Sequence, residues 1–217
     1  MTFTLGRLVE HDDRSRDHAF SVSAAKPKTI LWGHSAPVLD QGQVGSCTGN
    51  ALAQWLNTDF AQKLRKGVLA EADALKIYSL GTQLDSIPGS YPPDDTGSSG
   101  LAVCKAGVKL GYLSAYKHSF GFDALLLTLQ HTPVIVGTEW LKNMFTPNQT
   151  TGFIRATGAV AGGHEYLVLG CDMENEFITM LNSWASTWGQ NGRAKISFKD
   201  FEKLLAAQGD VTVPVIK

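Results

Sequence analysis

Cysteine is scarce in this sequence, which has three cysteines among 217 residues: Cys47, Cys104 and Cys171. Because they are odd in number and widely spaced, they do not resemble the disulfide framework of a small secreted protein, and they favour a reducing compartment. The N-terminal twenty residues also lack the apolar core of a signal peptide, since charges appear from Arg7 onward. We therefore expect a protein that is not exported.

Long apolar runs and basic clusters are also missing. No run approaches the ~20 apolar residues that a membrane-spanning helix needs. The 19 Lys and Arg residues are scattered among 20 Asp and Glu residues, so no basic stripe for nucleic acid is present. No group of His, Cys, Asp and Glu has the spacing of a metal site. We expect no membrane partner, no nucleic-acid partner, no metal and no cofactor.

The first half of the chain has the pattern of a helical lobe. Residues 1–30 are polar without a sustained period, and we expect an extended arm on the surface. Apolar residues then recur at helical spacing from Ala51 to Leu64, and Gly67 supplies a stop. This pattern places Cys47 at or just inside the N-terminus of a long, buried helix. Further helices are predicted over residues 71–80, 101–113 and 122–130.

The second half has the pattern of an antiparallel sheet. Its segments are short, rich in β-branched and aromatic residues and separated by Gly, Asn or Asp. Helices followed by strands predict an α+β fold with two lobes, since 217 residues with 43% hydrophobic residues can bury a substantial core. The predicted strands cover residues 133–140, 151–157, 164–172, 176–184 and 193–198.

Cys47 has two interpretations, a packed core thiol or a nucleophile. The N-terminus of a helix favours thiolate over thiol, because unpaired backbone N–H groups and the helix dipole lie there. Gln41, six residues earlier in a glycine-containing loop, could donate its amide to a developing oxyanion beside the Cys47 N–H. Taken alone, Gln41 is equally well explained as a surface loop residue.

His164 and Asn182 supply the other two groups that such a nucleophile needs. His164 follows two glycines and opens a predicted strand, whereas the other five histidines lie in polar or loop-like segments. Asn182 ends the next predicted strand, so antiparallel pairing could bring it beside His164. Its amide oxygen would then accept from the imidazole and fix the tautomer. Trp184 would shield that bond from water.

Three segments together resemble the papain family of cysteine peptidases: "QGQVGSC", "GGH" and "LNSWASTWGQNGRAKIS". The match extends from about Pro37 to Phe198, and the block from Asn182 to Gly192 is its most specific part. The separations of His164 and Asn182 from Cys47 are close to the ~130–150 residues expected of such a nucleophile and its partners.

The resemblance implies a role for each of these residues. Cys47 would be the nucleophile, His164 the base that becomes the general acid, and Asn182 the group that orients His164. Gln41 and the Cys47 N–H would form the oxyanion hole. It also implies a glycine-rich loop that pairs with the substrate backbone, for which residues 94–100 are the candidate. The implied substrate contacts are Gly97, Ser98, Ser99, Gly163, Trp184 and Trp188.

Several residues depart from the family pattern. The family's half-cystines are absent, and Ala185 replaces a glycine between the tryptophans. Glu165 follows His164 where a small residue is common, and we expect its carboxylate near the imidazole, where it would raise the basicity. The chain also begins too close to Cys47 for a long inhibitory pro-segment. These features resemble compact, disulfide-free members from microbes and their viruses.

We therefore expect residues 1–217 to form a single papain-like peptidase domain. The helical lobe (31–120) would carry the long helix that begins at the nucleophile, and the lobe at 121–217 an antiparallel sheet or barrel. The expected protein is a monomer, cytoplasmic or virion-associated, that hydrolyses a polypeptide substrate. Two alternatives stay open: a transamidase or cell-wall peptide amidase on the same scaffold, and a catalytically silent peptide-binding relative.

Overall fold

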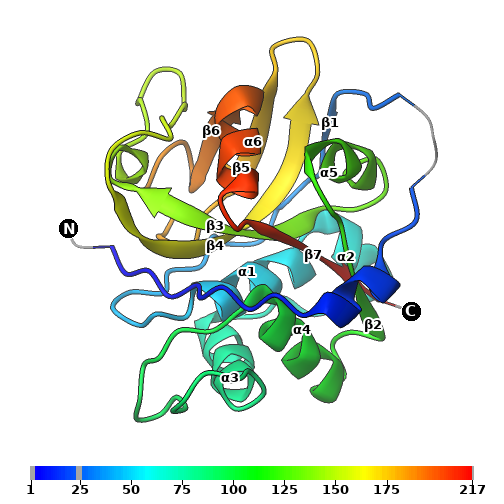
Figure 1. Ribbon diagram of the computed structural model, residues 1–217, viewed down its shortest axis with the longest axis vertical. Helices are drawn as coiled ribbons and strands as arrows, with labels where there is room; N and C mark the ends of the chain where they lie inside the picture. Colours follow the sequence, from blue (N-terminus) through cyan, green and yellow to red (C-terminus); the bar gives the residue numbers. More distant parts are fainter. Residues whose placement is uncertain (1–2, 23–25, 217) are drawn as a thin grey trace.

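A computed structural model describes residues 3–22 and 26–216 (Figure 1). No helix in this part of the chain combines the length and the apolar character needed to cross a membrane. The α-helices are α1 (Cys47–Leu56), α2 (Asp59–Leu64), α3 (Glu71–Thr82), α4 (Gly100–Lys109), α5 (Phe122–Thr128) and α6 (Phe198–Ala206), and the 3₁₀ helices are η1 (Asp13–His18) and η2 (Lys142–Phe145). The strands are β1 (Ile30–Leu31), β2 (Ala115–His118), β3 (Val134–Leu141), β4 (Val160–Asp172), β5 (Phe177–Leu181), β6 (Arg193–Ser197) and β7 (Asp210–Val215).

The strands form one antiparallel sheet in the order β2-β7-β3-β4-β5-β6, with β1 paired to β4. This sheet is open, with β2 and β6 at the two ends of the order. The α+β class and the papain-like arrangement of a helical lobe and a sheet lobe are confirmed. Of the two forms expected for the second lobe, the sheet is correct and the barrel is not.

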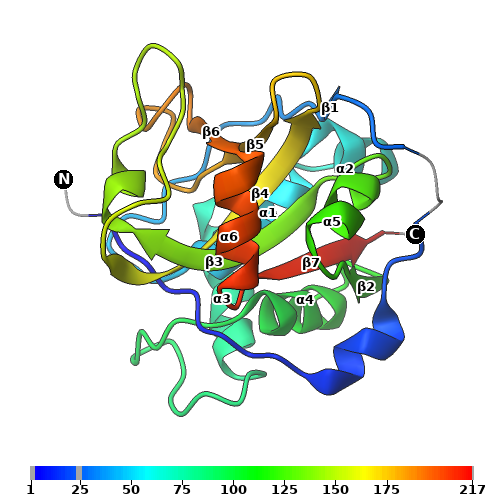
Figure 2. The ribbon, with the colours of Figure 1, turned by 45° about the horizontal axis from the view of Figure 1, so that its top comes forward.

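The central strands separate two hydrophobic clusters. In β3, Ile135 packs with the helices α1, α3 and α4, whereas Val136 packs on the opposite face with α5 and α6. Leu167 and Val168 divide in the same way in β4, because successive side chains of a strand point to opposite faces. Figures 1 and 2 show these two groups of helices on opposite sides of the sheet.

The helix that begins at Cys47 is buried along its whole length, but it is shorter than the apolar pattern indicated. It ends at Leu56, and Thr58 starts α2 by accepting a hydrogen bond from the Ala61 N–H at 3.2 Å. The helical spacing that continues to Leu64 therefore belongs to two helices with a capped break between them.

Other differences lie at both ends of the sheet. Residues 151–157, predicted as a strand, make only an isolated bridge between Phe153 and Lys195. The strands β2 and β7 and the helix α6 were not predicted. β7 lies between β2 and β3, so Gly137 of β3 pairs with Asp210 of β7 on one side and with Glu165 of β4 on the other.

Candidate active site

Cys47 is the first residue of α1, and its side chain is fully buried. The preceding loop is held at both ends by hydrogen bonds. The Gln41 N–H donates to the Ser183 carbonyl at 2.9 Å, and the Gly45 N–H donates to Asp95 Oδ2 at 2.8 Å. Asp95 also accepts from the Tyr78 hydroxyl. It therefore ties the Cys47 loop to α3.

His164 and Asn182 lie together, as the antiparallel pairing of β4 and β5 predicts. The distance from His164 Nε2 to Asn182 Oδ1 is 2.7 Å, and the same oxygen accepts from the Ser183 N–H at 2.8 Å. The Asn182 amide is therefore fixed, and it fixes the ring. Trp184 stacks on the imidazole at 4.6 Å, and Trp140 meets it edge-on at 4.9 Å.

The tryptophan cluster around His164 is larger than the sequence indicated. Trp188 lies against Trp184, 5.4 Å between ring centroids, and its indole N–H donates to the Phe145 carbonyl. Trp188 thus supports Trp184 from behind. The contact of Trp140 with His164 was not predicted from the sequence. The alternation of β3 and β4 side chains on one face is the signal that relates Trp140 to His164.

Cys47 faces the β4 backbone beside His164. Burial raises the pKa of the thiol, and the backbone N–H groups of Glu165, Gly6 and Thr48 oppose that rise, which places the thiol against the strand residue that follows His164. No hydrogen bond joins the thiol to the imidazole. The other ring nitrogen, His164 Nδ1, is buried and has no hydrogen-bond partner among the described residues. It is the ring atom available to exchange a proton.

The Gln41 amide is oriented from both of its ends. Ser183 Oγ donates to Gln41 Oε1 at 2.7 Å, and Gln41 Nε2 donates to the Val44 carbonyl at 2.9 Å. The same Nε2 also donates to the backbone carbonyl of Thr4 at 3.2 Å. A peptide carbonyl from the N-terminal segment therefore already rests on this amide, close to Cys47.

Residues 3–8, called here the covering segment, lie across the site. This segment belongs to the expected surface arm, yet it pairs with both lobes. The Arg7 N–H donates to the Gly163 carbonyl at 3.0 Å, the Ser98 N–H donates to the Gly6 carbonyl at 2.9 Å, and the Leu8 N–H donates to the Ser98 carbonyl at 2.7 Å. In Figure 1 the dark-blue segment crosses between the sheet and the helices α3 and α4.

Two glycine positions allow the segment to approach closely. A Cβ at Gly97, where φ is 77°, would lie 2.5 Å from the Gly6 carbonyl oxygen, and a Cβ at Gly163 would lie 2.2 Å from the Arg7 carbonyl oxygen. Phe3 at the start of the segment stacks on Trp184 at 4.5 Å. The main-chain track is therefore continuous from Trp184 to Ser98.

Four of the six predicted substrate contacts lie along the covering segment, namely Gly97, Ser98, Gly163 and Trp184. Ser99 instead caps α4 through the Ala102 N–H and donates to Glu10 Oε2 at 2.5 Å. Trp188 lies behind Trp184.

Beneath the covering segment, the Cys47–His164 pair carries no charge at neutral pH. Burial raises the pKa of Cys47 to about 12. Burial also lowers the pKa of His164 to about 4, although the hydrogen bond that the ring donates to Asn182 opposes this shift. Because both shifts favour the uncharged forms, the covered pair is a thiol and a neutral imidazole.

The expectation that Glu165 raises the basicity of His164 is wrong. Glu165 is the next residue of β4, so its side chain points to the opposite face of the sheet. There it meets Asp210 and Arg7, and it makes no contribution to the pKa of His164. Within the described residues, no group of three His, Cys, Asp or Glu side chains could hold a metal ion.

Comparison with known protein sequences gives a weak likeness. No model of a known protein family matches the sequence. The chain is similar to the gamete and mating-type specific protein A of Dictyostelium discoideum, with 24% identity over 194 residues that cover 78% of this chain and 42% of that protein. The chain therefore spans less than half the length of this relative.

Comparison with solved structures gives a strong likeness. Xylellain, a cysteine protease from Xylella fastidiosa, matches with a TM-score of 0.81 and 18% identity over 99% of this chain and 97% of that chain. Digestive procathepsin L 3 of Tenebrio molitor larval midgut matches with a TM-score of 0.65 and 15% identity over 98% and 76%. A cysteine protease of Carica candamarcensis matches with a TM-score of 0.59 and 17% identity over 88% and 100%.

Proposed function

From the papain-like cysteine protease fold, which the chain shares with these proteins, we propose that it is a cysteine peptidase. It hydrolyses peptide bonds in a polypeptide substrate, and residues 1–217 act as a single peptidase domain. One observation carries this proposal: the buried thiol at the start of α1 lies against the strand whose His164 is bonded to Asn182 at 2.7 Å. A packed core thiol would have no need of an oriented imidazole with an unpaired nitrogen beside it.

In the proposed reaction His164 Nδ1 takes the proton of Cys47, and the sulfur attacks the carbonyl carbon of the substrate. Gln41 Nε2 and the Cys47 N–H hold the oxyanion. The C–N bond breaks as His164 gives the proton to the leaving amine, and a thioester is left on Cys47. Water then gives a proton to His164 and attacks the thioester. The acid leaves as the C–S bond breaks, and His164 returns its proton to the Cys47 sulfur.

The covering segment has to leave this track before a substrate can bind. Its departure also changes the chemistry of the site, because water would then reach both reacting groups. With less desolvation the pKa of Cys47 falls and that of His164 rises, so a thiolate–imidazolium pair becomes accessible. Coverage and protonation therefore act in the same direction, and the protein is active only while the covering segment is displaced.

Cleavage of a peptide library by the full chain tests the proposal, with the Cys47→Ala variant as the blank. We expect defined products from the wild-type chain and none from the variant, while the two proteins have similar melting temperatures. Product masses in the presence of an added amine separate hydrolysis from transamidation. Equal cleavage by both proteins would refute the role of Cys47.

A further inference from the structure

The side chain of Arg7 is enclosed on the far side of the sheet from His164. It is 1% exposed, and its guanidinium is paired with Asp210 at the start of β7. Nε donates to Asp210 Oδ1 at 3.1 Å, Nη2 donates to the same carboxylate, and Nη2 also donates to the Gln208 carbonyl at 2.6 Å. A residue of the covering segment thus fills a pocket with its side chain while its backbone pairs with Gly163.

The sheet register builds this pocket. Gly137 of β3 lies directly opposite Glu165 of β4 on one side and Asp210 of β7 on the other. Directly opposed residues share a face, so the two carboxylates flank a position that has no side chain. A Cβ at Gly137 would lie 2.5 Å from Glu165 Oε2 and 2.6 Å from Arg7 Nε. The space for the guanidinium therefore depends on this glycine.

A second glycine forms the opposite wall. A Cβ at Gly100, the first residue of α4, would lie 2.4 Å from Glu165 Oε1 and 3.1 Å from Asp210 Oδ2. Both lobes therefore contribute to the pocket, the sheet through its carboxylates and α4 through a residue without a side chain. We call the space bounded by Gly100, Gly137, Glu165 and Asp210 the acidic pocket.

Glu165 is the feature of the acidic pocket that Arg7 leaves unused. It is fully buried, and neither of its carboxylate oxygens has a hydrogen-bond partner among the described residues. A buried carboxyl group without hydrogen bonds is costly in a folded protein. Burial and the neighbouring Asp210 raise its pKa, whereas the charge of Arg7 lowers it. Glu165 therefore lines the pocket as a carboxyl group with unused hydrogen-bonding capacity beside the guanidinium.

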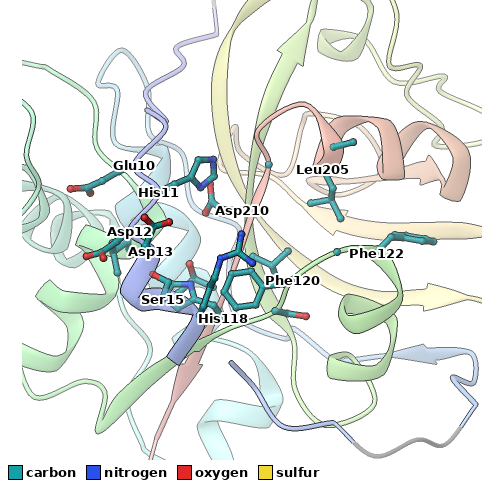
Figure 3. A pocket seen from close by; sticks show the side chains of 18 of the residues that line it. Glu10, His11, Asp12, Asp13, Ser15, His118, Phe120, Phe122, Leu205 and Asp210 are labelled. Carbon is teal, nitrogen blue, oxygen red and sulfur yellow. The ribbon is translucent and has the colours of Figure 1, made fainter. Parts of the chain in front are cut away.

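Asp210 of the acidic pocket also borders a larger cavity of about 570 Å³. Asp210 lines this cavity together with Glu10, Asp12 and Asp13 from the N-terminal segment (Figure 3). Because the carboxylates that line this cavity outnumber its one arginine, Arg16, its charge favours the approach of a positively charged side chain to Asp210.

We propose that the acidic pocket is the specificity site of the enzyme and that it accepts a basic side chain of the peptide substrate, arginine in preference to lysine. The inference rests on the proposed peptidase function. The substrate residue concerned is the one whose backbone takes the place of Arg7 between Gly163 and Ser98. Arginine is favoured because its planar fork can donate two N–H groups to Asp210 and one to the Gln208 carbonyl, as Arg7 does, whereas an ammonium is a single point of charge.

The first test uses the full chain carrying Arg7→Ala, which empties the pocket. Matched peptides differ at one position, with arginine or citrulline, its uncharged isostere. We expect kcat/KM at least tenfold higher for arginine, and a ratio near one when Asp210→Asn and Glu165→Gln are added. Glu202→Gln, on the same cavity wall but outside the pocket, is the control and should keep the ratio. Equal rates for both peptides in the Arg7→Ala chain would overturn the proposal.

A second test does not depend on catalysis. The melting temperature of the Arg7→Ala chain should rise saturably with N-propylguanidine and should not rise with N-propylurea. Adding Asp210→Asn should abolish the rise, with circular dichroism confirming that this variant is folded. A rise without any peptide cleavage would support the pocket and refute the peptidase function. Cleavage without preference and without a rise would support the function and overturn the pocket.

Discussion

The side-chain amide of Gln41 donates to the backbone carbonyl of Thr4 at 3.2 Å. The proposed oxyanion donor thus already holds a peptide carbonyl, and that carbonyl belongs to the chain itself. The covering segment follows the same track with its backbone, from Phe3 on Trp184 to Gly6 on Ser98. It therefore occupies the places that a substrate peptide would need.

Loss of the Arg7 side chain should uncover Cys47. Arg7→Ala removes charge-assisted hydrogen bonds worth about 1.5–3 kcal/mol, so the open state should gain population by on the order of 10- to 100-fold. The rate of Cys47 alkylation by iodoacetamide, followed by mass spectrometry, should rise by the same factor. Arg14→Ala removes an exposed arginine that pairs with Asp12 outside the segment, and its rate should equal that of the wild type. Equal rates for all three proteins would show that Arg7 does not hold the segment closed.

Loss of Asn182 should affect turnover more than binding. In Asn182→Ala the imidazole loses its 2.7 Å partner, and a misplaced catalytic group costs on the order of 100-fold in rate. We expect kcat to fall by that amount with KM nearly unchanged, because Asn182 does not contact the substrate track.

Asn143→Ala is the matched control for that change, since it also removes a side-chain hydrogen bond, here to Thr157 on the surface. It should keep the wild-type kcat. A rise in KM with an unchanged kcat in Asn182→Ala would contradict the orienting role and indicate a binding residue instead.

The buried histidines should make the protein less stable at acid pH. Burial lowers the pKa of His164 from 6.5 to about 4, so between these values the unfolded chain binds a proton that the folded chain does not. The free energy of unfolding therefore falls as the pH is lowered from 6.5 towards 4. The loss that His164 causes amounts to about 3 kcal/mol.

Urea unfolding of the wild type and of His164→Gln at pH 7 and pH 4.5 measures this loss. The difference in unfolding free energy between the two pH values should be smaller in the variant. His34→Gln should show the same effect, because burial also lowers the pKa of His34 to about 4. Identical pH dependence in all three proteins would contradict the buried, neutral state of these rings.

The parts of the site that could be predicted from sequence are those with local signals. The small residues and helical spacing after Cys47 predict a helix start there, and the two strands that end near His164 and Asn182 predict their pairing. The positive φ of Ala185, 61°, also agrees with the glycine expected at that position. Strand alternation already predicts that Glu165 points to the opposite face of the sheet from His164. The expected effect of its charge on His164 ignored this alternation.

The covering segment could not be predicted, because its contacts with Ser98 and Gly163 are made by the backbone and leave no periodic pattern in residues 3–8. β7 was missed because it contains Pro214 and is recognisable mainly by its partners β2 and β3. The acidic pocket depends on that strand, so it was missed too. α6 did have a signal, the helical spacing of Phe198, Phe201 and Leu205.

The most direct test is to trap the acyl-enzyme. The full chain carrying Arg7→Ala is mixed with a peptide p-nitrophenyl ester and quenched in acid, and the acyl group is located by peptide mapping. The account predicts one acyl group per chain, on Cys47 and not on the buried Cys104 or Cys171, and none when Cys47→Ala is added. Ester and peptide turnover that continues with no acyl group on Cys47, or that survives Cys47→Ala, would contradict it.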